Sequence, residues 1–429
     1  MKGLKLSLIV MTATLITLGL SGMAFAFHAG GVAECGLCHS MHAPAPGGTK
    51  LLIKTDQSST CLFCHSNPGD TAPSSYHILT LDADAPAGSP PVHRTPGGDF
   101  GWIRKTYSYT LRGEAMVEPG QEHGHNVVAK DYGLETDPDK PTAPGGVFNS
   151  TNLGCTSCHD PHGQFRRDSS EAVQFRAGGP IIASGSYNNS PGNGSTALPA
   201  GQTVGVYRLL AGSGYNTGGV TFNGVPQAVA PSTYNRSEVT FQTRVAYGNK
   251  ATNGHVKWGT WCATCHGKMH TEGGNYVHKV DWPLSGDIRQ IYQQYKGSGN
   301  MTGADATSYL SLVPFAENNK TYALLGPNAQ RNDTKLQGPS SDQDEVNCLS
   351  CHRAHASGFK NALRWNMEGE MILIDGSWPG TDATKTAAQE AKWSQGRTYK
   401  EMAGAYYEYP ESKFASYQRV LCNKCHAKD

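Results

Sequence analysis

The sequence repeats the pattern Cys-x-x-Cys-His six times, and this repeat constrains the fold more than any other feature of the chain. The pattern is the attachment signature of c-type haem, because its two thiols bond covalently to one porphyrin and its histidine binds the iron from one face. The six copies use all 12 cysteines, so none remains for a disulfide, a catalytic thiol or a redox switch. The motif residues are, in order, Cys35, Cys38 and His39; Cys61, Cys64 and His65; Cys155, Cys158 and His159; Cys262, Cys265 and His266; Cys348, Cys351 and His352; and Cys422, Cys425 and His426.

A single copy has two other interpretations, namely half of a zinc site or a thioredoxin-like dithiol. Six copies that each end in histidine, and that together exhaust the cysteines, argue against both. The sequence therefore predicts a hexahaem c-type cytochrome with six covalently attached haem c groups, each holding one iron. We number the haems 1 to 6 in the order of their motifs.

The composition leaves the chain short of aliphatic side chains for a core of its own. Hydrophobic residues make up 38%, below the roughly 45–50% of ordinary domains, and the chain holds 51 glycines and 24 prolines. Such a chain buries too little apolar surface to offset its conformational entropy, so we expect the porphyrins to supply the missing core and folding to depend on haem. The predicted fold is mostly coil with a few short helices and minor strand pairs, wrapped around a chain of six haems.

Residues 1–26 are predicted to be a signal peptide, and residues 27–429 a single hexahaem unit. Lys2 and Lys5 form a basic region, residues 6–20 an apolar run, and residues 24–26 the small-residue cleavage pattern. A retained membrane anchor is the alternative, but the apolar run is short for a span. Without the two leader lysines the chain has one fewer basic than acidic residue, and twelve haem propionates then make the protein mildly anionic, which argues against nucleic acid as a partner.

Local patterns predict only small elements. Broken alternation favours a short strand pair within residues 102–111, and residues 177–233 are the most loop-like stretch, expected to wrap haem edges at the surface or to order at a subunit contact. Helical periodicity first appears after Ser285, a candidate N-cap. Further helices are predicted over residues 384–393, over residues 399–407, and from residue 411 into the last motif.

The distal iron ligands must come from the remaining histidines. Of the 17 histidines, six belong to the motifs, which leaves eleven for six positions. Every haem can therefore be bis-histidine, which is typical of electron transfer and leaves no open iron for catalysis. No methionine occupies a comparably repeated position.

Three candidates, His42, His162 and His355, follow a motif histidine by three positions, an offset that points the second imidazole towards a neighbouring haem. The other predicted ligands are His77, His125, His278, His28 and His270. Among these, the local pattern does not decide between His28, His270 and His278. We expect His93, His123 and His255 to be surface histidines, because His93 lies in a proline-rich turn and His123 competes with His125.

Several segments carry a family resemblance beyond the motifs: FHAGGVAE at residues 27–34, PSSYHI at 73–78, PGGDFGW at 96–102, APSTYNR at 230–236, NCLSCHRAHASG at 347–358 and YQRVLCNKCHAKD at 417–429. In these segments the chain resembles the outer-surface hexahaem c-type cytochromes of metal-reducing bacteria. The resemblance implies polymerisation into extracellular filaments with one continuous haem stack. It also implies that His42 binds the iron of haem 5, attached at Cys348, Cys351 and His352, in the neighbouring subunit.

The leading functional hypothesis is an electron conduit at the cell surface or in an extracellular filament. Such a protein receives electrons from upstream periplasmic or outer-membrane cytochromes and passes them to external acceptors such as metal oxides or partner cells. A soluble periplasmic shuttle or electron store has the same haem chemistry and differs in assembly. A multihaem redox enzyme needs an open iron, often marked by Cys-x-x-Cys-Lys, and the sequence contains no such motif.

Overall fold

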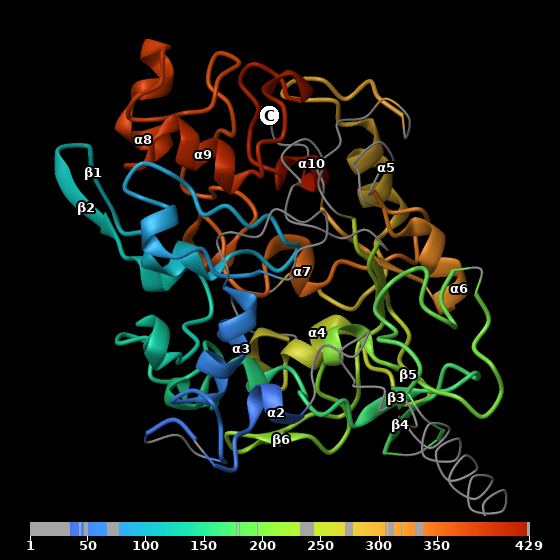
Figure 1. The fold of residues 1–429 in the computed structure, drawn as a ribbon. Coiled ribbons are helices and arrows are strands. Elements are labelled where there is room, and N and C mark those ends of the chain that lie inside the picture. The colour runs from blue at the N-terminus through green and yellow to red at the C-terminus, as the bar shows by residue number, and fades with distance from the viewer. Residues whose placement is uncertain are drawn as a thin grey trace, which may run out of the picture.

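The structure is a computed structural model, and the residues that it describes are 35–42, 44–46, 50–66, 77–176, 178–179, 181–194, 196–231, 244–270, 278–304, 307, 313–318, 320–330 and 338–426. The predicted signal peptide and His28 lie outside them. Coil dominates, with short helices and small sheets, as predicted. Helix α2 (Cys35–Cys38) lies at one end of the molecule, and α8 (Ala391–Ser394) and α9 (Tyr399–Ala405) lie at the other (Figure 1). No helix in this described part is long and apolar enough to cross a membrane.

Each haem motif forms about one turn of helix. In five motifs the histidine N–H donates to the carbonyl of the first cysteine at 2.9 to 3.1 Å, and the second motif lies within a longer helix. Residues at positions i, i+3 and i+4 share one helix face, so both thiols and the imidazole face the same side. The elements that carry the motifs are α2, α3 (Gln57–His65), the 3-10 turn Cys155–Ser157, α4 (Trp258–Cys262) with the turn after it, α7 (Cys348–Cys351) and α10 (Asn423–His426).

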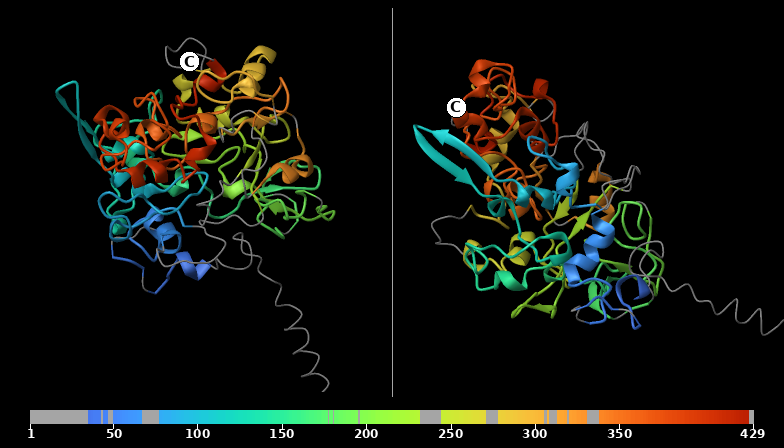
Figure 2. Two further views of the ribbon diagram at one scale, coloured as in Figure 1. Left: turned by 90° about the horizontal axis from the view of Figure 1, so that it is seen from above. Right: turned by 60° about the vertical axis from the view of Figure 1, so that its left-hand side comes forward.

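The most prominent strand pair is an antiparallel hairpin that projects from the body (Figures 1 and 2). It joins β1 (Tyr107–Leu111) to β2 (Glu114–Glu118), with Tyr107 opposite Glu118 at its base. The prediction for residues 102–111 is thus partly correct, because its first residues belong instead to the 3-10 helix Phe100–Arg104. The described residues also form three smaller sheets. The strand order is β4 (Val173–Phe175), β3 (Phe165–Arg167) and β5 (Val204–Gly205) in one, and β10 (Ala316–Glu317), β9 (Ala246–Gly248) and β8 (Ala228–Val229) in another. The third sheet pairs β6 (Asn216–Thr217) with β7 (Val220–Thr221).

Two predicted helices are confirmed with their caps. Helix α5 (Gly286–Gln294) begins after Ser285, whose side chain accepts a hydrogen bond from the N–H of Ile288. Helix α9 begins after Thr398, which forms a capping box with Glu401. In both cases the cap satisfies backbone donors that have no partner inside the helix.

The other two helix predictions are wrong in their extent. Residues 384–393 split into the 3-10 turn Thr386–Gln389 and α8, because Glu390 has an extended backbone between them. Between residue 411 and α10, the only helical element is the 3-10 turn Glu411–Lys413. The backbone then pairs with a distant segment, since Ile372 donates to the carbonyl of Gln418 and Val420 donates to that of Glu370.

Part of the loop-like stretch is buried inside the folded chain. Within residues 181–231, apolar side chains that include Val206, Val225 and Ala228 are buried in a cluster with Trp258, which begins the helix of motif 4. This part of the stretch packs within its own chain, and its expected contacts with haem edges or another subunit stay predictions.

Candidate haem sites

The motifs follow one another in space in the same order as in the sequence. Burial and a neighbouring thiol raise the pKa of Cys38, Cys158 and Cys351, and a hydrogen bond to a neighbouring thiol, together with burial, raises that of Cys61 and Cys262. Each of these electrostatic interactions and hydrogen bonds joins a thiol of one motif to a thiol of the next, so the candidate haem attachment sites form a single series. The neighbouring pairs are Cys38 and Cys64, Cys61 and Cys155, Cys158 and Cys265, Cys262 and Cys348, and Cys351 and Cys422.

Four motif histidines face a second imidazole. An imidazole nitrogen binds a transition metal at about 2 Å, so two imidazoles on opposite sides of one iron place their ring centres roughly 6 Å apart. The observed separations match this spacing, which fits four bis-histidine haems. The pairs and their ring-centre distances are His39 and His162 (6.4 Å), His159 and His355 (6.5 Å), His266 and His125 (6.0 Å), and His426 and His278 (6.0 Å).

Backbone carbonyls orient the motif imidazoles. Nδ1 of His39, His159, His266 and His352 lies 2.7 to 2.9 Å from a carbonyl oxygen, supplied by Lys50, Arg208, Pro144 and Asn361, respectively. A carbonyl can only accept, so the proton is on Nδ1 and the lone pair is on Nε2. Each ring is therefore fixed in the tautomer that binds iron through Nε2.

At motifs 1, 3 and 5, the segment that orients the motif imidazole has the same backbone conformation. Residues 50–51, 208–209 and 361–362 each place two successive non-glycine residues in the left-handed region, with φ between 51° and 58°. The leucine that follows each pair forms a bridge to the motif histidine, so that Leu52 lies opposite His39, Leu210 opposite His159 and Leu363 opposite His352. We call these three segments, residues 50–52, 208–210 and 361–363, the clamp segments. Their strained backbone coincides with the haem sites.

The same three motifs carry the additional histidine three positions after the motif histidine. The clamp segment and the histidine three positions after the motif histidine occur together at motifs 1, 3 and 5. The chain therefore contains an internal structural repeat at every second motif. Sequence reasoning found the histidine offset but missed the clamp segments. The shared sequence signal is a leucine at Leu52, Leu210 and Leu363, because only asparagine among the left-handed residues Lys50, Arg208 and Asn361 is of a type enriched in that region.

Two distal candidates are held as neutral imidazoles. Burial and the nearby His266 lower the pKa of His125 to about 4, and burial and the nearby His159 lower that of His355 to about 3. The Nδ1 atom of His125 donates to the carbonyl of Ala354 at 2.7 Å, which leaves Nε2 for a metal. A neutral imidazole is the form that binds iron.

The three histidines that we expected at the surface are in fact buried. His123 contacts the Trp102 carbonyl at 3.0 Å and Glu118 at 2.7 Å, and His255 contacts two backbone carbonyls at 3.1 and 3.0 Å. Both nitrogens of each ring are thus engaged, which leaves none for a metal. His93 is 2% exposed, and its ring centre lies 5.6 Å from that of His77.

The remaining predicted ligands have different surroundings. His77 is buried, and the N–H of the residue after it donates to the His65 carbonyl, which places His77 beside motif 2. His270 directs Nε2 at the Asp281 carboxylate at 3.1 Å. His42 is exposed near α2.

Comparisons with known proteins show which family the chain belongs to. No family model matches the chain. Over 457 residues the chain is 46% identical to the C-type cytochrome OmcS of Geobacter sulfurreducens, with 100% of each protein covered. Two solved structures, one of OmcS nanowires and one of an Outer Membrane Cytochrome S filament from the same organism, match with TM-scores of 0.81 and 0.80. Each is 44% identical, and each match covers 94% of this chain and 100% of the other. A c-type cytochrome holds covalently bound haem c with iron, and this chain belongs to the family of the C-type cytochrome OmcS.

Proposed function

We propose that the chain is a filament-forming hexahaem cytochrome that carries electrons out of the cell along stacked bis-histidine haems. The haems supply a reversible one-electron iron couple. The chain's own residues hold two imidazoles on each iron, so no position is left for a substrate, and the protein transfers electrons without catalysing a reaction.

The observation that carries this proposal is the register of the repeat. His162 follows motif 3 and faces the histidine of motif 1, and His355 follows motif 5 and faces the histidine of motif 3. Each additional histidine therefore serves the haem two places earlier in the series. By the same rule His42, which follows motif 1, serves a haem two places before haem 1, and that haem belongs to another copy of the chain.

Haem 5 is the haem to which this rule assigns no distal imidazole from its own chain. Nδ1 of His352 is held by Asn361 at 2.8 Å, and no second imidazole among the described residues faces this ring. Two places before haem 1 of one subunit is haem 5 of a preceding subunit with six haems. We therefore assign His42 to the haem 5 iron, at Cys348, Cys351 and His352, of the neighbouring subunit.

The surface around motif 1 suits such a contact. Leu37 in motif 1, Met41 beside His42 and Leu51 in the clamp segment are 52%, 79% and 47% exposed. Apolar side chains gathered at one end of a molecule favour a protein interface. When the rotation between successive subunits does not close a ring, a head-to-tail contact of this kind generates a helical filament.

The related proteins support the same assembly. The solved relatives are described as nanowires and as an outer membrane cytochrome filament. We extend this to the present chain as a secreted, cell-surface filament of six haems per subunit. Upstream periplasmic or outer-membrane cytochromes supply its electrons, and external acceptors such as metal oxides or partner cells receive them.

Electron microscopy and spectroscopy of the haem-loaded His42→Ala variant test this proposal. We expect the variant to lose filaments and to convert one haem per chain from low-spin to high-spin. His255→Ala is the control, because both nitrogens of this buried ring lie within hydrogen-bond distance of carbonyl oxygens, and it should leave filaments and all six low-spin haems intact. Filaments of His42→Ala with six low-spin haems contradict the proposal, and a monomeric wild-type protein favours the soluble shuttle.

A further inference from the structure

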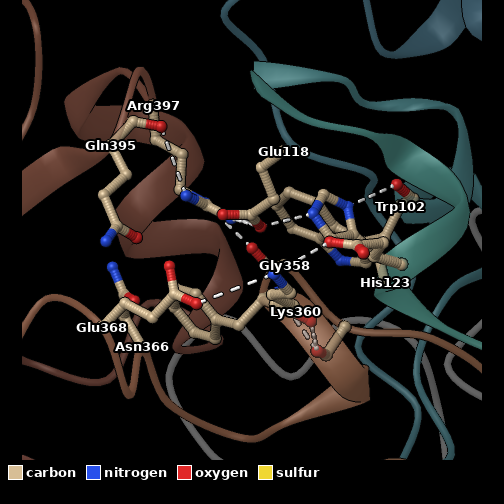
Figure 3. A network of polar contacts seen from close by, with 12 residues as sticks. Trp102, Glu118, His123, Gly358, Lys360, Asn366, Glu368, Gln395 and Arg397 are labelled. Atoms are coloured by element: carbon tan, nitrogen blue, oxygen red, sulfur yellow. Dashed lines mark hydrogen bonds and ion pairs between the residues drawn. The ribbon is translucent and has the colours of Figure 1, made fainter. Parts of the chain in front are cut away.

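A buried polar cluster lies at the base of the projecting hairpin (Figure 3). Its members are Glu118 at the end of β2, His123 in the 3-10 turn Gly120–His123, and Arg397 before α9. The Glu118 carboxylate accepts from Arg397 and lies 2.7 Å from Nε2 of His123. The side chains of His123 and Arg397 are fully buried and that of Glu118 is 4% exposed, so the charges meet away from water.

The cluster is tied to two separate backbone segments. Nε of Arg397 donates to the carbonyl of Gly358 at 2.9 Å, and the N–H of Ser357 donates to the carbonyl of His123 at 3.0 Å. Glu118 thus holds His123 directly and holds the segment after His355 through Arg397. A buried charge that lost these partners would carry a large desolvation cost.

The same two segments carry two of the distal histidines. The N–H of His125 donates to the carbonyl of His355 at 2.9 Å. A Cβ atom on Gly124 would clash with this same carbonyl oxygen, so the two backbones pack without intervening side chains. His125 faces His266, and His355 faces His159. A shift of either segment therefore moves an imidazole relative to haem 4 or haem 3.

We infer that Glu118, His123 and Arg397 form a positioning unit that sets the geometry of His125 and His355 on two successive haems. The inference rests on the proposed ligand roles of these two histidines. None of the three residues touches a motif histidine through the contacts described above, and they act through the backbone of residues 123–125 and 355–358. The electronic state of a bis-histidine haem depends on how its axial ligands are oriented, so the unit tunes haems 3 and 4 together.

The test uses electron paramagnetic resonance and redox titration of the full, haem-loaded protein. His125→Ala and His355→Ala first identify the signals of the two haems, because each variant converts one low-spin haem to high-spin. Glu118→Gln keeps the size of the side chain and removes its charge, and it should shift the signals and reduction potentials of those two haems and leave the other four unchanged. Arg397→Lys, which keeps the charge but cannot bond to both Glu118 and Gly358 in the same way, should shift the same two signals less.

Glu317→Gln is the matched control. Glu317 is 5% exposed and pairs with Arg244 at 3.6 Å, but it lies in β10 and contacts none of the paired histidines. It should lower stability and leave all six haem signals in place. The inference is overturned if Glu118→Gln shifts no signal, or shifts all six equally. If His125→Ala and His355→Ala leave six low-spin haems, the ligand assignment is wrong, and the positioning role fails with it.

Discussion

The rings of His39 and His162 lie 6.4 Å apart and within 11° of parallel, although one belongs to motif 1 and the other follows motif 3. An iron bound between these two rings would join the two attachment sites. His159 and His355 repeat the relationship one step further along the chain. A haem chain built in this way would be held together by metal–ligand bonds between distant segments as well as by packing, which suits a chain with few aliphatic side chains.

Replacing His162 by alanine should convert one haem to high-spin, because haem 1 then lacks its distal imidazole. Visible absorption and electron paramagnetic resonance of the ferric protein measure this change. His255→Ala is the control, since both nitrogens of this buried ring already bond to carbonyls. That variant should lower thermal stability with all six haems still low-spin. Six low-spin haems in His162→Ala would show that another group ligates haem 1.

The clamp segment at haem 5 should tolerate glycine and reject a β-branched residue. Asn361 has a φ of 58°, a region open to glycine and unfavourable for valine. Asn361→Val should therefore lower the free energy of unfolding by about 1–3 kcal/mol, whereas Asn361→Gly should change it by less than about 1 kcal/mol. Thermal unfolding of the two variants measures the difference. Equal effects would mean that the left-handed backbone is not maintained in solution.

Glu118 should contribute to stability in a defined acid range. Burial raises the pKa of Glu118, but the hydrogen bond from His123 and the charge of Arg397 outweigh it and lower the pKa to about 2. A carboxyl with a lowered pKa stabilises the folded state above its unfolded pKa of about 4.3, and this contribution is lost as the pH falls towards 2. The contribution is on the order of 3 kcal/mol.

Thermal unfolding of wild type and Glu118→Gln between pH 6 and pH 2 tests this titration. The stability difference between the two proteins should be largest above about pH 5 and should shrink as the pH falls. A difference that stays constant over this range would show that Glu118 is not ionised in the folded protein.

Arg167 should hold the loop-like segment in place. Its side chain is 1% exposed, donates to the carbonyl of Gly192 at 3.1 Å and to Oδ1 of Asn193 at 2.6 Å, and stacks on Tyr322. Arg167→Met leaves these acceptors unpaired, at a cost of about 1–3 kcal/mol. Limited proteolysis should then cut within residues 181–194 faster than in wild type. Arg176→Met, at an exposed arginine, should leave the cleavage rate unchanged.

The residues that could be predicted from the sequence are those whose signal is local. The candidate N-cap Ser285 caps helix α5, and the helical periodicity after it corresponds to that helix. The offset of His162 and His355 likewise needs only neighbouring positions. The candidate haem sites were therefore proposed from short patterns alone.

What could not be predicted depends on partners far along the chain. His123 and His255 are buried because Glu118, Trp102, Val225 and Glu171 supply acceptors for their ring nitrogens, and no pattern around the histidines reveals these acceptors. The helix expected after residue 411 fails for a similar reason, since Gln418 gives its carbonyl to a distant segment. Tertiary pairing overrides helical periodicity at such positions.

We propose above that His42 binds an iron in another copy of the chain. A cryo-electron microscopy reconstruction of filaments of this protein tests it most directly, at a resolution that separates axial imidazoles from the porphyrin. We expect continuous density from Nε2 of His42 to the iron of the haem attached at Cys348 and Cys351 of the adjacent subunit, with His352 on the opposite face. Density that places His42 in solvent or on a haem of its own subunit would contradict it.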